Sequence, residues 1–165
     1  MHRVIPLTLD RANHPDRESS LTPPPFWWSW PNAPALNLAN QLKIQGPVLA
    51  PAAACATGLV SLLRAVDVIR QGTCDVVLAG SCDASLQPAL LASYRRLGVM
   101  ARHGNPQNAC RPFDIHRQGF LVGEGAAVLV LERLEHALKR KATPMVEIVA
   151  GRVLSDGAGV TGLDE

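Results

Sequence analysis

The chain has 165 residues, of which 47% are hydrophobic, and a formal net charge of +2. This length supports one hydrophobic core of ordinary size, and so small a charge favours neither a nucleic-acid surface nor a membrane surface. No apolar run reaches membrane-spanning length, and the first residues lack the apolar stretch of a signal peptide. We therefore expect a cytoplasmic protein that binds neither nucleic acid nor membrane.

Proline and tryptophan are concentrated at the start of the chain. Pro23-Pro24-Pro25 and all three tryptophans lie there, which is typical of an irregular segment with a large apolar surface. We expect this segment to cover residues 1–31, a domain to cover 32–156 and a tail to cover 157–165. Within the domain, the first predicted element is a short helix over residues 32–42.

The strongest local signal surrounds Cys55. Residues 48–54 are uncharged and predict a short buried strand, and the apolar spacing that follows predicts a helix over 57–71, closed by Gly72. A cysteine at a helix start meets unpaired backbone N–H groups and the positive end of the helix dipole, which favour a thiolate and can hold an oxyanion. On position alone, a small buried cysteine is an equally good interpretation.

A second apolar strand over residues 75–80 predicts a parallel β-α-β unit in a sheet that is covered on both faces. The next helix begins near Pro88 and ends at Gly98. The remaining predicted elements are a strand over 126–131, a helix over 132–141 that includes a Glu132–His136 pair, and a last strand over 144–153.

The chain also contains residues of the types used in three other kinds of site. The cysteines at 55, 74, 82 and 110 lack the spacing of metal ligands, so we expect reduced thiols and no metal or other cofactor. The glycines of residues 119–125 fit no nucleotide-binding fingerprint, because a strand follows them where a helix is needed. A cysteine hydrolase stays open, with His103 or His116 as the base by elimination.

Several ordered motifs lie at compatible separations along the chain. They are Gly46-Pro47, Ala54-Cys55-Ala56-Thr57-Gly58, residues 75–80, Arg111-Pro112-Phe113-Asp114 and residues 119–132. Together they resemble the β-ketoacyl-acyl carrier protein synthases, the condensing enzymes of the thiolase superfamily, from about residue 32 to 156.

This resemblance implies an α/β, thiolase-like layered fold, with a mixed, mostly parallel sheet and helices on both faces. Of that duplicated fold, the chain would hold one incomplete half. It further implies a homodimer or heterodimer that works with acyl carrier protein and with acyl and malonyl thioesters.

The resemblance also assigns roles to particular residues. Cys55 would take an acyl group from a carrier-protein thioester, with its backbone N–H as one oxyanion donor, before the carbanion of a decarboxylated malonyl thioester attacks. Ala54, Leu90 and Tyr94 would contact the substrate. Leu90 stands where some relatives have glycine, which predicts a narrower acyl pocket, although core packing explains Leu90 and Tyr94 equally well.

Two histidine motifs of the family, His-Gly-Thr-Gly-Thr and Asn-x-x-x-Gly-His, do not occur in the sequence. The resemblance therefore implies part of a synthase of fatty-acid or polyketide synthesis that does not complete the condensation alone. A non-catalytic subunit or remnant that pairs with a complete synthase is the alternative, and a thioester-cleaving cysteine hydrolase is a further one.

Overall fold

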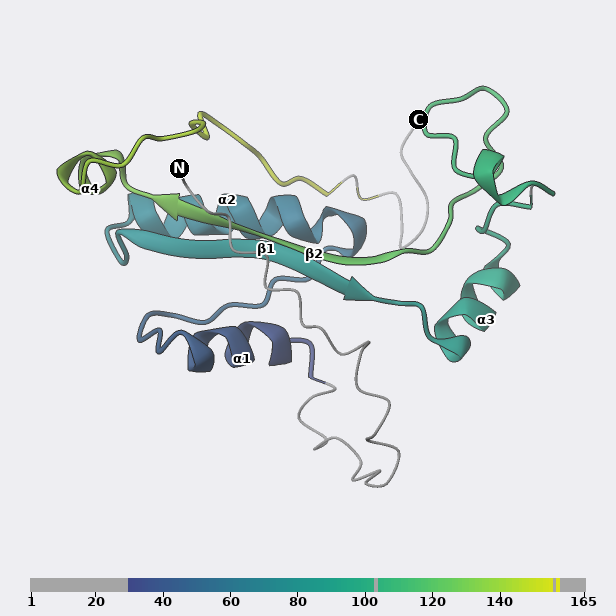
Figure 1. Ribbon diagram of the computed structural model, residues 1–165, viewed down its shortest axis with the longest axis horizontal. Helices are drawn as coiled ribbons and strands as arrows, with labels where there is room; N and C mark the ends of the chain where they lie inside the picture. Colours follow the sequence, from purple (N-terminus) through teal and green to yellow (C-terminus); the bar gives the residue numbers. More distant parts are fainter. Residues whose placement is uncertain (1–29, 103, 156, 158–165) are drawn as a thin grey trace.

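A computed structural model describes residues 30–102, 104–155 and 157, and its centre is a pair of long strands with one helix packed along them (Figure 1). The expected proline- and tryptophan-rich segment lies almost wholly outside these residues. In chain order the elements are α1 (Ala33–Gln41), the 3-10 turn η2 (Ala54–Ala56), α2 (Thr57–Arg70), β1 (Val76–Ala84), α3 (Pro88–Leu97), the 3-10 turn η3 (Pro106–Asn108), β2 (Glu124–Glu132) and α4 (Leu134–Lys139).

The predicted helices are confirmed, with small shifts at their ends. α2 follows the apolar spacing that starts after Cys55, and α3 begins at Pro88 and ends at Gly98, which has a left-handed φ of 71°. α4 begins two residues later than predicted, because the backbone N–H of Arg133 donates to the carbonyl of Asp75 at 2.9 Å. None of the helices in the described part of the chain is long and apolar enough to cross a bilayer.

The sheet differs from the prediction. β1 pairs with β2 in antiparallel orientation, from Val76 opposite Glu132 to Ala84 opposite Glu124, and these two strands form the whole sheet of the described residues. The expected mostly parallel sheet is thus reduced to one antiparallel pair, with a single parallel bridge between Met100 and Phe120 elsewhere. An apolar run predicts burial, but the choice of partner depends on contacts far apart in sequence.

Two predicted strands are absent. Residues 48–53 have no strand assignment, and Val48 and Leu49 are exposed; a strand needs a hydrogen-bonded partner, and no ladder within the described residues includes this segment. Residues 144–153 are likewise no strand. They lie against α2 instead, where Arg70 donates to the carbonyl of Val149 at 3.2 Å.

The core lies between α2 and the strand pair. Its buried residues are Ala65, Ala79 and Leu131, and partly buried apolar side chains surround them: Leu62, Val66, Ile69, Val77 and Ile148. Small side chains at the centre let the helix approach the strands closely, so α2 is held in a fixed position relative to β1.

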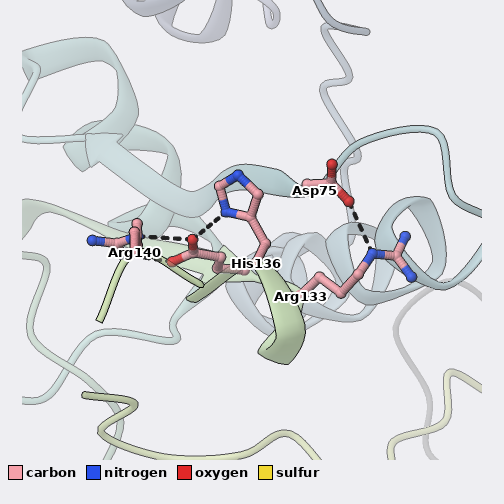
Figure 2. A network of polar contacts seen from close by, with 5 residues as sticks. Asp75, Arg133, His136 and Arg140 are labelled. Atoms are coloured by element: carbon pink, nitrogen blue, oxygen red, sulfur yellow. Dashed lines mark hydrogen bonds and ion pairs between the residues drawn. The ribbon is translucent and has the colours of Figure 1, made fainter. Parts of the chain in front are cut away.

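Two arginines form hydrogen bonds and ion pairs that link the ends of α2, the two strands and α4 (Figure 2). Arg133 donates to the Asp75 carboxylate at 2.9 Å and to the carbonyl of Ile69 at 2.7 Å, which satisfies one of the last carbonyls of α2. Arg140 donates to both carboxylate oxygens of Glu132, at 2.9 and 2.6 Å. His136 contacts the same carboxylate, as its spacing from Glu132 predicted. Arg140, directly after α4, therefore pairs with the last residue of β2 as well as lying near the helix end.

This network predicts an acid-dependent loss of stability. Hydrogen bonds from Arg140 first, and then from His136, lower the pKa of Glu132 from 4.5 to about 2. Because the folded-state pKa is below the unfolded value, the contribution of Glu132 is complete above pH 4.5 and is lost as the pH falls towards 2. We expect the free energy of unfolding, from urea titrations, to fall across this window and to fall less in Glu132→Gln.

The matched control is Glu135→Gln, which removes a carboxylate from the exposed face of α4. It should leave the pH dependence close to that of the unmodified chain. If both substitutions weaken the pH dependence of the free energy of unfolding equally, then overall charge, and not the Glu132 network, causes the loss of stability in acid.

Candidate active site

The first turns of α2 pack directly on β1. A side chain at Gly58 would place its Cβ 3.0 Å from Oγ of Ser81, so only glycine fits this approach without a shift of the neighbouring hydroxyl. One turn later, the N–H of Gly80 donates to Oγ of Ser61 at 3.3 Å. This contact brings the residues before α2 to the carboxyl-terminal end of β1.

Cys55 is the middle residue of η2, the 3-10 turn that leads directly into α2. Its side chain is exposed, and it is one of four free thiols. The preceding residue, Ala54, has a φ of +45°, in the left-handed region that residues other than glycine rarely adopt. The turn therefore gives the backbone a sharp change of direction immediately before Cys55.

The hydroxyl of Thr57 makes two hydrogen bonds across this turn. Its Oγ1 accepts from the N–H of Ala53 at 2.9 Å and donates to the carbonyl of Ala54 at 2.7 Å. The N–H of Ala56 also donates to the carbonyl of Ala53, at 2.9 Å. Both peptide groups that flank the left-handed residue are thus held in place.

An open groove of about 510 Å³ lies beside Cys55, between this turn and the adjoining ends of the two strands. Its lining residues are Ala54, Cys55, Thr57, Gly58, Ser81, Cys82, Asp83, Gly125, Ala126 and Ala127. The groove is bordered on one side by the positive end of the α2 dipole, which favours developing negative charge. The arrangement can present a thiol to an extended substrate and stabilise an oxyanion next to it.

Of the other predicted site residues, Ala54 lines the groove, whereas Leu90 and Tyr94 do not. These two lie on α3, where the Tyr94 ring meets Phe120 edge to face, with ring centroids 5.5 Å apart. A contact between either side chain and an acyl group stays a prediction.

His116, one of the two histidines considered for a hydrolase, is not among the residues that line the groove beside Cys55. None of the groove-lining residues in the described part of the chain is a histidine. His116 is exposed in the loop between α3 and β2, where its backbone N–H donates to the Asp114 carboxylate at 2.7 Å. His136 pairs with Glu132, the last residue of β2, whereas the groove lies at the other end of that strand. His103 lies outside the described residues.

The part of the groove that the two strands provide was not predicted from the sequence. Ser81, Cys82 and Asp83 continue β1 beyond its predicted end, and the segment 125–127 faces them on β2. The usable signal was the position of these polar residues directly after an apolar strand. The groove itself could not be predicted from that signal, because it depends on an antiparallel pairing that brings residues more than forty positions apart into register.

Residues 8–137 match the family described as "Beta-ketoacyl synthase, N-terminal domain". The chain belongs to this family. A putative polyketide beta-ketoacyl synthase 1 from Streptomyces cyaneus is 38% identical over 134 residues, which are 81% of this chain and 32% of that protein. The chloroplastic 3-oxoacyl-[acyl-carrier-protein] synthase I of Hordeum vulgare is 38% identical over 125 residues, which are 75% of this chain and 27% of the relative.

The structure is similar to that of a type II polyketide ketosynthase in complex with its acyl-carrier protein. The TM-score is 0.65 at 35% identity, and the similarity covers 68% of this chain and 28% of that one. The fold is therefore that of the thiolase-like ketosynthases, represented in part. The chain spans 32% and 27% of the length of these two curated relatives.

Proposed function

We propose that this chain carries the acyl-accepting half of a β-ketoacyl synthase site, with Cys55 as the nucleophile. The observation that carries the proposal is the exposed Cys55 thiol, at the start of α2 and in an open groove, within the part of the chain that matches the family. A thiolate there attacks the carbonyl of an acyl thioester, and the departing carrier thiolate takes up a proton. The acyl group is then held as a new thioester on Cys55.

The donor in this proposal is acyl carrier protein, and the second substrate is a malonyl thioester. The ketosynthase of the similar structure is in complex with such a carrier protein, which supports the choice of donor. Ala54 borders the bound acyl group, and Leu90 and Tyr94 contact its chain. The chain functions in the cytoplasm as a homodimer or heterodimer, in fatty-acid or polyketide synthesis.

The condensation step needs groups outside these 165 residues. Decarboxylation of the malonyl thioester and stabilisation of its carbanion use the two histidine motifs named above, and neither occurs in the sequence. By itself, the chain thus accepts an acyl group on Cys55 but forms no β-ketoacyl product. A non-catalytic subunit is the second candidate, and the same experiment separates the two.

The test is to incubate the chain with an acyl-loaded acyl carrier protein and to follow its intact mass. We expect a gain of one acyl group that hydroxylamine removes, as it does from thioesters. Adding a malonyl-loaded carrier protein should give no β-ketoacyl product. Failure to gain the acyl group would favour the non-catalytic subunit. Formation of product by this chain alone would contradict the proposal that condensation needs groups outside these 165 residues.

A further inference from the structure

The hydroxyl of Thr57 bridges the peptide N–H of Ala53 and the peptide carbonyl of Ala54, the left-handed residue that precedes Cys55. It accepts from Ala53 and donates to Ala54, so both of its hydrogen-bonding functions are used on this one turn. The backbone of Ala54, at a φ of +45°, lies in a region that disfavours any side chain with a Cβ. Such a conformation persists only where its surroundings hold it, and the hydroxyl supplies two of the contacts that do so.

The turn also fixes the direction of the Cys55 side chain. A change of φ at Ala54 rotates every atom that follows it, and Cys55 is the next residue. Thr57 is held against such a change, because it is the first residue of α2 and a Cβ at the adjacent Gly58 would come within 3.0 Å of Oγ of Ser81, so the helix lies close to β1 here. The helix therefore serves as the fixed support from which the hydroxyl holds the turn.

We propose that Thr57 is a positioning residue, whose hydroxyl keeps Ala54 left-handed and thereby keeps the Cys55 thiol presented to the groove. Thr57 contacts no reacting atom in this role. The inference adds a residue to the proposed acyl-accepting site and rests on that function for its biological meaning. Its test uses neither a carrier protein nor an acyl group. A negative result would therefore count against the role of Thr57 and not against the acyl-accepting role of Cys55.

The test compares Thr57→Val, which keeps the shape and loses the hydroxyl, with Thr57→Ser, which keeps the hydroxyl. The readout is the rate of alkylation of Cys55 by iodoacetamide, which forms a carbon–sulfur bond and releases iodide and the thiol proton. Peptide mass mapping gives the rate for each cysteine, and exposed Cys110 in the same molecule serves as the internal reference. Thr143→Val, at an exposed position after α4, is the matched control.

We expect Thr57→Val to lower the ratio of Cys55 to Cys110 alkylation about tenfold, because two hydrogen bonds are lost together. Thr57→Ser and Thr143→Val should stay within about twofold of the unmodified chain. If Thr57→Val raises the alkylation of the half-buried Cys74, the sign of unfolding, Thr57→Ala takes its place with the same expected ratio.

An unchanged ratio in the folded hydroxyl-free variant would overturn the proposal. So would an equal loss in Thr57→Ser, because that result would assign the effect to the methyl group of Thr57 and not to its hydroxyl. A purely structural role would lower stability without changing the ratio between the two cysteines.

Discussion

Replacing Cys55 by alanine is expected to abolish acyl transfer to the chain, with a fall in rate of at least about 1,000-fold. The reason is chemical: alanine has no nucleophile, and the transfer has no alternative route through the backbone groups that remain in the groove. The rate is measured from the gain in intact mass with an acyl-loaded carrier protein. The fold should persist, because the Cys55 side chain is exposed and belongs to no core contact.

Two further cysteines provide the controls for this experiment. Cys82 lines the same groove, and Cys110 is an exposed thiol outside it. Cys110→Ala should retain transfer within about threefold, because Cys110 lies outside the groove, and Cys82→Ala should retain transfer because it keeps the Cys55 nucleophile. If transfer is retained in Cys55→Ala and lost in Cys82→Ala, the nucleophile is Cys82 on β1.

The second large effect is expected at Gly80, in the middle of β1. A Cβ at this position would lie 2.8 Å from Cα of Val128 and even closer to the carbonyl oxygen of Ala127. Both are backbone atoms of β2 and cannot rotate away, so Gly80→Ala must force the strands apart. We expect a loss of about 3 kcal/mol in the free energy of unfolding, at the upper end of the usual cost of overpacking.

Gly123→Ala is the matched control, because a Cβ there meets no atom within 4 Å. Gly123 lies directly before β2 and should tolerate the methyl group with little change. Urea denaturation followed by circular dichroism gives both values. Equal losses in the two variants would mean that the strand pair does not require the close approach seen at Gly80.

Much of the local structure follows from the sequence because its causes are local. The apolar spacing after Cys55 and the glycine at 72 predict α2, and Pro88 with Gly98 predicts α3 almost to the residue. The position of Cys55 at the start of a helix follows from the same local reasoning.

The pairing of the strands was not predictable in the same way. Residues 48–54 and 76–80 are both apolar, and apolar composition specifies burial without specifying the partner strand. The observed partner of β1 is β2, and Gly80 lies where the two strands approach closely. A glycine in the sequence does not indicate which strand will approach it.

The candidate site was predicted in part for a related reason. Cys55 and Ala54 came from a motif, but the left-handed conformation of Ala54 has no signal in the identity of an alanine. The threonine three residues later was the available clue, since threonine hydroxyls often bond to nearby backbone groups. The strand residues of the groove needed the antiparallel register, which only the folded chain supplies.

The most direct test of the acyl-accepting role is to locate the transferred acyl group by tandem mass spectrometry. The chain is incubated with an acyl-loaded acyl carrier protein, digested under conditions that preserve thioesters, and sequenced peptide by peptide. We expect the added mass on Cys55 and on none of Cys74, Cys82 or Cys110. An acyl group on another cysteine, with Cys55 unmodified, would contradict the account.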